Sequence, residues 1–265
     1  MAELPQPRQD FGRGTLRMPS TIIRLLAPLL ILAAGAAAAQ PAEEVDAALR
    51  DVPVYAVMAD YYPEAYAQIR RITLDGLARG ESVAEATLAA RPVYLNLLAE
   101  QLPRTDDPTL LATVALTRDQ ARAALAVDPG RCLAVLGIGT AEALPGDYLP
   151  KAMADRELRL AAEVLRQAAE SPAPPEPPMS GLDAEALSVA AYAGLPSDAE
   201  RDLFLQMDGE PARAATAAQK RAYCDYMLAM FDVILAKPEP EAARLYRQLL
   251  ALSQDEAPVS PPPER

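Results

Sequence analysis

The clearest helical periodicity in the chain lies in residues 221–253, which read RAYCDYMLAMFDVILAKPEPEAARLYRQLLALS. Along the first half, apolar side chains recur at i, i+4, i+7 and i+11, at Cys224, Leu228, Phe231 and Leu235. The second half supplies a matching apolar face at Leu245, Leu249 and Leu252. The pattern predicts helices over 211–236 and 240–253, which pair as an antiparallel hairpin around Pro238 and Pro240.

The rest of the chain carries helix start and stop signals of the same kind. Further helices are predicted over residues 43–50, 54–62, 63–80, 82–102, 107–127, 132–136, 150–168, 183–194 and 198–207. Ser82 followed by Glu85 is a capping box, and Asp107 before Pro108 is a cap followed by a first-turn proline. Pro92 should kink or divide its helix. Residues 132–136 could also form a strand, but we favour a buried helix.

The composition points to an all-α fold. The 265 residues are 51% hydrophobic, enough for a substantial core, whereas aromatic residues make up only 5% and tryptophan is absent. We predict an irregular multi-helix bundle in one domain, residues 40–254. The proline-rich segment 171–180 should form a semi-rigid linker between the blocks 40–170 and 181–254. The proline-rich tail 255–265 is predicted to be disordered.

The first 39 residues have the layout of a secretory signal peptide. Arg17 and Arg24 precede an apolar run from Leu25 to Ala34, and small residues follow up to Ala39. These are the basic, apolar and cleavage regions that a signal peptidase requires, so we expect cleavage after Ala39. The alternative is an uncleaved anchor, although the apolar run is shorter than the roughly 20 residues that span a bilayer. We therefore expect a periplasmic or secreted protein with no stable membrane span after cleavage.

The net charge argues against a nucleic-acid partner. The chain has 25 basic and 37 acidic residues, a net charge of −12. A phosphate backbone would be repelled by such a surface.

The two cysteines suggest a structural bond. Cys132 and Cys224 lie on opposite sides of the linker, and export would allow a disulfide between them. A loop of this length would add on the order of 4–5 kcal/mol of stability in the chain-entropy model. The alternative is a pair of buried free thiols.

The chain lacks histidine and the familiar catalytic sequence motifs. It contains no histidine, which removes serine and cysteine triads and imidazole metal ligands. Gly137-Ile138-Gly139 is only half of a dinucleotide fingerprint and lacks a βαβ setting, so we expect neither a cofactor nor a metal. Paired carboxylates could still cleave glycan, and Glu142 and Asp225 are the least ordinary acids, although a surface or capping role is the favoured interpretation of both.

Tyrosines form two clusters, at Tyr55, Tyr61, Tyr62 and Tyr66 and at Tyr223 and Tyr226. They could line a groove for a peptide, a glycan or a partner helix, but core packing with the hydroxyl at the boundary is the favoured interpretation. Arg70 and Arg71 could contact an anionic ligand or be solvated. The leading hypothesis is a noncatalytic exported protein that binds an unidentified protein or envelope component, and the alternative is a carboxylate-dependent enzyme that cleaves cell-wall glycan.

Overall fold

A computed structural model of the chain describes residues 42–138, 149–207 and 216–255. Within these ranges all regular structure is helical, which confirms the all-α prediction. The helices are α1 (Ala42–Arg50), α2 (Pro53–Tyr61), α3 (Pro63–Ala78), α4 (Val83–Gln101), η2 (Leu102–Arg104), α5 (Asp107–Val127), α6 (Pro129–Val135), α7 (Lys151–Glu170), α8 (Gly181–Ala193), α9 (Asp198–Gln206), α10 (Ala217–Leu235) and α11 (Glu239–Asp255). The signal segment, its cleavage point, Glu142 and the tail from residue 256 lie outside the described residues.

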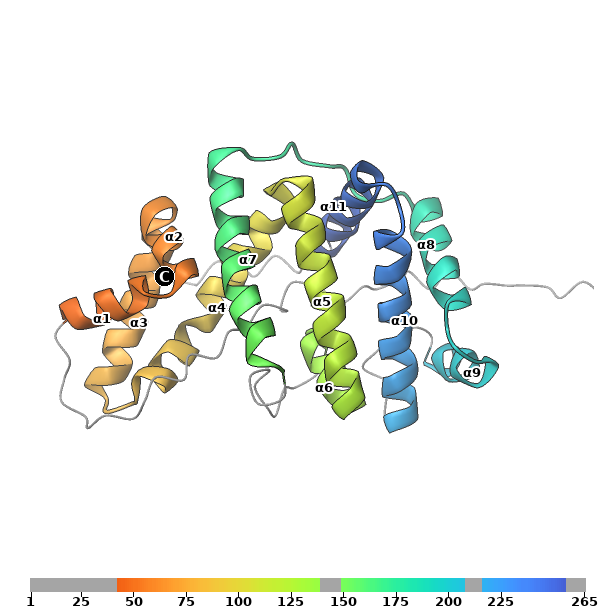
Figure 1. Cartoon of the computed structure of the whole chain (residues 1–265), viewed down its shortest axis with the longest axis horizontal. Coiled ribbons are helices and arrows are strands. Elements are labelled where there is room, and N and C mark those ends of the chain that lie inside the picture. The colour runs from red at the N-terminus through yellow and green to blue at the C-terminus, as the bar shows by residue number, and fades with distance from the viewer. Residues whose placement is uncertain (1–41, 139–148, 208–215, 256–265) are drawn as a thin grey trace, which may run out of the picture.

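The helices follow one another across an elongated bundle (Figure 1). α1 to α4 form one end, with α3 packed along α4, and α2 joins this end to α7. α7 packs on α5, α5 on α10, and α10 on α8 and α9 at the far end. The core runs through this series, and its largest fully buried side chains include Tyr94, Phe231, Met58 and Ile69.

The proline-rich linker is tied down between the two halves of the bundle. Extended backbone follows α7, and the amide of Ala173 donates to the carbonyl of Arg104 at 2.7 Å. Near the other end, the amide of Met179 donates to the carbonyl of Gln248 at 3.2 Å, and the Met179 side chain is buried. Because α10 and α11 also pack on α5, the residues before and after the linker share one core.

Local capping explains where several helices begin, and the structure corrects three local predictions, at Pro92, Asp107 and Pro129. Ser82 and Glu85 form the predicted capping box, and α4 continues through Pro92 as one helix. The cap of α5 is Asp106 rather than Asp107, since the Asp106 carboxylate accepts from the amide of Thr109 at 2.9 Å. Asp128 separates α5 from α6, which begins at Pro129, so the proline opens a helix rather than only ending one.

α10 begins later than the sequence pattern predicted. Thr216 has extended backbone angles, and its side chain makes a reciprocal capping box with Gln219. The helix therefore starts at Ala217 instead of residue 211, and residues 211–215 lie outside the described part of the chain. Farther along α10, Cys224 and Phe231 are fully buried, as the stripe predicted.

The two cysteines meet where α6 packs on α10. Their Cα atoms are 6.3 Å apart, within the range of disulfides, although 92 positions separate them in the sequence. The contact joins the block before the linker to the block after it.

One buried arginine fastens α11 to the start of α5. The guanidinium of Arg247 donates to the carbonyls of Pro103 and Thr105 at 3.0 and 2.7 Å, and to the Asp107 carboxylate at 2.6 Å. The Arg247 side chain is only 7% exposed. The planar guanidinium donates in three directions, to three acceptors at the junction of η2 and α5.

Candidate functional site

Of the four tyrosines in the first cluster, Tyr55 and Tyr66 are buried in the core, Tyr62 is half-buried and Tyr61 is 41% exposed. Tyr55 is buried edge-to-face against Tyr94, with the ring centroids 6.3 Å apart. Tyr61 donates to the Glu170 carboxylate, and the Tyr62 hydroxyl donates to the carbonyl of Leu165 at 2.8 Å. These two hydroxyls hold the α2–α3 corner against α7. The favoured interpretation of core packing is confirmed for Tyr55 and Tyr66, whereas the ring of Tyr61 is exposed.

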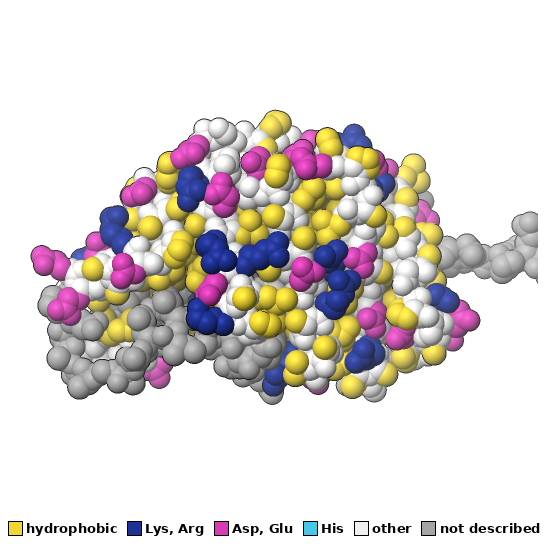
Figure 2. Space-filling view, in the orientation of Figure 1, with side chains coloured by type: hydrophobic (Ala, Val, Ile, Leu, Met, Phe, Trp, Pro, Cys, Tyr) yellow, Lys and Arg dark blue, Asp and Glu magenta, His cyan; other side chains and the backbone are white. Residues whose placement is uncertain are grey.

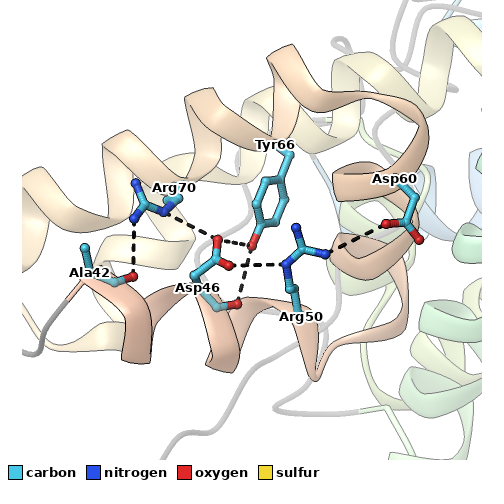
Figure 3. Close-up of polar contacts among 6 residues, drawn as sticks. All are labelled: Ala42, Asp46, Arg50, Asp60, Tyr66 and Arg70. Carbon is cyan, nitrogen blue, oxygen red and sulfur yellow. Dashed lines mark hydrogen bonds and ion pairs between the residues drawn. The ribbon is translucent and has the colours of Figure 1, made fainter.

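The fourth tyrosine of this cluster anchors α1 (Figure 3). The Tyr66 hydroxyl donates to Asp46 Oδ1 at 2.7 Å, and Arg50 Nε donates to the other carboxylate oxygen at 3.2 Å. Arg70 reaches Asp46 Oδ1 at 3.4 Å and the carbonyl of Ala42 at 3.4 Å. The tyrosine hydrogen bond and the two arginines lower the pKa of Asp46, while burial and that carboxylate raise the pKa of Tyr66 to about 12.

The two adjacent arginines therefore have different surroundings. Arg70 is engaged with α1, whereas Arg71 is exposed on the neighbouring side of α3. The two side chains do not combine into an anion site.

The second tyrosine pair belongs to an aromatic cluster at the far end of the bundle. The ring of Phe204, on α9, stacks on Tyr226 at 4.2 Å and on Tyr223 at 6.1 Å between centroids. Tyr192, on α8, adds a tilted contact with Phe204 at 6.2 Å. Phe204, Tyr223 and Tyr226 are all buried, so the rings hold α8, α9 and α10 together and leave little ring surface for a ligand.

Asp225 lies beside this cluster and is half-buried. Burial raises the pKa of its carboxyl, the negative charge of Glu200 on α9 raises it further, and Arg221 opposes the shift. A carboxyl whose protonated form is favoured beside a second carboxylate is an arrangement that general acids use. Of the two acids singled out from the sequence, Asp225 is the one the structure describes.

Sequence reasoning missed the most deeply buried acid. Glu157, on α7, is 1% exposed and accepts a hydrogen bond from the Gln120 side-chain amide of α5 at 2.6 Å. Tyr94 lies fully buried nearby, and its pKa is raised by burial and then by the charge of Glu157. Glu157 follows Ala154 by three positions and precedes Ala161 by four, which places it on the apolar stripe of α7. This spacing could have predicted its burial from the sequence. Because it is sealed in the core, it joins α5 to α7 and does not face a substrate.

α8 leaves an apolar face open to solvent. Its inner side, with Leu187 and Ala191, is buried against α10, and the Tyr226 hydroxyl donates to Ser188 at 3.0 Å. On the outer side, Leu182 is 80% exposed and Val189 57% exposed. Large apolar side chains exposed on a helix whose other side is buried are a feature of interaction surfaces, so we take the outer face of α8 as the candidate binding surface.

Within ranges 42–138, 149–207 and 216–255, no three cysteine or acidic side chains are grouped so that they could hold a metal ion. No helix in this part of the chain is long and apolar enough to cross a bilayer. Comparison of the chain with protein-family models, with curated proteins and with solved structures yields no match.

Proposed function

We propose that the protein is an exported, noncatalytic binding protein, and that the outer face of α8 binds a protein of the cell envelope. The observation that carries this proposal is the exposure of Leu182 and Val189 on a helix whose opposite side is already buried. Solvent-exposed apolar surface of this kind is stabilised when a second apolar surface covers it. Export is supported by the basic and apolar pattern of the first 39 residues and by two cysteines at disulfide distance.

The rigid attachment of α8 favours its use as a binding platform. α8 begins with a Ser180 cap, whose side chain accepts from the amide of Asp183 at 3.1 Å, and its inner face is fixed by α10. A partner would therefore dock on a preformed helix without first ordering it, which lowers the entropic cost of binding.

The test is site-specific photo-crosslinking in the envelope of a Gram-negative host. A photoreactive residue at position 189 should give a discrete crosslinked product, and the same residue at position 127 should not. Val127 is a matched control because it is exposed to the same 57%, at the end of α5. The crosslinked partner is then purified, and its affinity for the wild type and for Val189→Ser is measured by calorimetry. Equal affinities, or recovery of the chain only from the cytosol, would overturn the proposal.

A second candidate function is carboxylate-dependent glycan cleavage, and it rests on the raised pKa of Asp225 beside Glu200. Purified cell wall incubated with the protein would lose turbidity if this function holds. Asp225→Asn should then abolish the clearing while Asp202→Asn, an exposed acid on α9, leaves it unchanged. No clearing by the wild type would exclude this candidate.

A further inference from the structure

The outer face of α8 has the spacing of a helix-packing ridge. Leu182, Ala186, Val189 and Ala193 follow one another at i, i+4, i+7 and i+11, and all four are exposed. At about 100° of rotation per residue they fall within a narrow stripe, roughly opposite the buried Leu187 and Ala191. Two large side chains alternate with two alanines along the stripe, so a second helix could seat its own side chains between them. The geometry fits a helix rather than a flat surface or an extended peptide.

Acidic side chains flank this ridge on both sides. Glu185 lies about 70° to one side of the stripe and Asp183 about 90° to the other, and both are exposed. They are the only charged residues of α8. Residues 181–206, which cover α8 and α9, contain one arginine against five acidic residues, a net charge of −4.

The one arginine of α8 and α9 is already engaged. Arg201 binds Asp198 at 2.5 Å and the carbonyl of Leu195 at 2.8 Å. Elsewhere, Lys and Arg side chains gather over the middle of α7 and α5 (Figure 2), away from the α8 end of the molecule. An incoming helix therefore meets an apolar ridge between acidic margins.

This charge pattern discriminates between occupants. A second copy of the chain would bring the same acidic margins against each other, in a protein whose net charge is −12. Like charges brought together across an interface are repulsive, whereas opposite charges favour the encounter and fix the orientation.

We propose that α8 binds a cationic amphipathic helix, whose apolar face covers the Leu182–Ala193 ridge and whose lysines or arginines lie beside Asp183 and Glu185. This inference rests on the proposed function and names the chemistry of the partner. Recognition follows the i, i+4, i+7 mode by which amphipathic helices dock on apolar surfaces.

The experiment uses two synthetic helical peptides with the same leucine face, one with lysine and one with glutamate on the polar face. Binding to the full chain as isolated from the periplasm is followed by fluorescence anisotropy at several salt concentrations. The lysine peptide should bind more tightly than the glutamate peptide, and the difference should shrink as salt rises.

Variants then separate the apolar and the charged contributions. Val189→Ser should weaken the lysine peptide about tenfold, the effect expected when one exposed valine no longer becomes buried. Val127→Ser should change its affinity less than about twofold. The double variant Asp183→Lys/Glu185→Lys should weaken the lysine peptide and strengthen the glutamate peptide. Glu43→Lys/Glu44→Lys, on α1, makes the same change in net charge at the other end of the molecule and should have a much smaller effect.

Each contrary result points to a different failure. Binding that depends on Val189 but is equal for both peptides would contradict the proposal of a cationic partner, and would still support α8 as the binding site. A dimer in sedimentation that is lost in Val189→Ser would identify a second copy as the occupant, and binding of neither peptide would also overturn the inference. Equal effects of Val189→Ser and Val127→Ser would remove α8 as the site, and with it the proposed function.

Discussion

Replacing Arg247 with leucine should be among the most damaging single changes in the C-terminal half. The side chain is 7% exposed and supplies donors to the carbonyls of Pro103 and Thr105 and to the carboxylate of Asp107. Leucine keeps much of the apolar volume but leaves both carbonyls without this donor. α11 would remain attached to the start of α5 only through its apolar contacts.

The expected loss follows from the environment of each acceptor. A buried acceptor that loses its donor costs about 1–3 kcal/mol, and the Thr105 contact is fully buried while the Pro103 contact is partly so. The Asp107 side chain is 34% exposed, so solvent screening reduces the ion pair to less than about 1 kcal/mol. We expect Arg247→Leu to lower the free energy of unfolding by about 2–4 kcal/mol in total.

Urea denaturation followed by circular dichroism measures this loss. Arg244→Leu is the matched control, because Arg244 is an exposed arginine one turn earlier on α11, and its replacement should change stability by less than about 0.5 kcal/mol. Asp107→Asn isolates the ion pair and should cost less than the leucine variant. If Arg247→Leu unfolds at the same urea concentration as Arg244→Leu, the argument that the guanidinium fastens α11 to α5 is refuted.

Three further changes test other contacts. Replacing both cysteines with alanine should lower the free energy of unfolding by about 4–5 kcal/mol, given their separation of 92 positions, and mass spectrometry that finds two alkylated thiols without reductant would contradict the bond. The Tyr66 hydrogen bond holds the pKa of Asp46 below the ordinary value of an aspartate, so this contact stabilises the protein above that ordinary value and loses its effect as the pH falls through the lowered pKa. The difference in melting temperature between the wild type and Asp46→Asn should therefore shrink in that acid range, and a pH-independent difference would refute the assignment. Gly76→Ala would place a Cβ 2.6 Å from the Ala86 Cβ and should destabilise the α3–α4 pair by about 1–3 kcal/mol in thermal unfolding, whereas Gly181→Ala, which meets nothing within 4 Å, should not.

Local signals in the sequence predicted most helices because capping and periodicity act over a few residues. Ser82 with Glu85 and Pro63 each mark an observed helix start. Errors arose where two adjacent residues could both serve, as at Asp106 and Asp107, or where a proline both ends one helix and begins the next, as at Pro129. Nothing in a local pattern ranks such neighbours, since the choice depends on which amides the side chain reaches.

The candidate site was much harder to predict. Asp225 drew attention because it follows Cys224 on an apolar helix, but the neighbour that shifts its pKa, Glu200, lies on α9. The exposed outer face of α8 was not predicted, because a sequence shows that a helix is rich in apolar residues but does not show which of its sides the rest of the protein covers. Leu187 and Val189 are two positions apart, and only packing on α10 makes one buried and the other exposed.

The sequence by itself determined the helical class, most helix boundaries and the pairing partners available to two cysteines, because propensity, capping and residue type are properties of short segments. Tertiary structure alone decided that Glu157 is buried against Gln120, that the Tyr61 and Tyr62 hydroxyls donate to groups on α7, and that α8 keeps an exposed face. These outcomes depend on which segments, far apart along the chain, exclude water from one another. Burial is a property of the assembled surface, so no local pattern contains it.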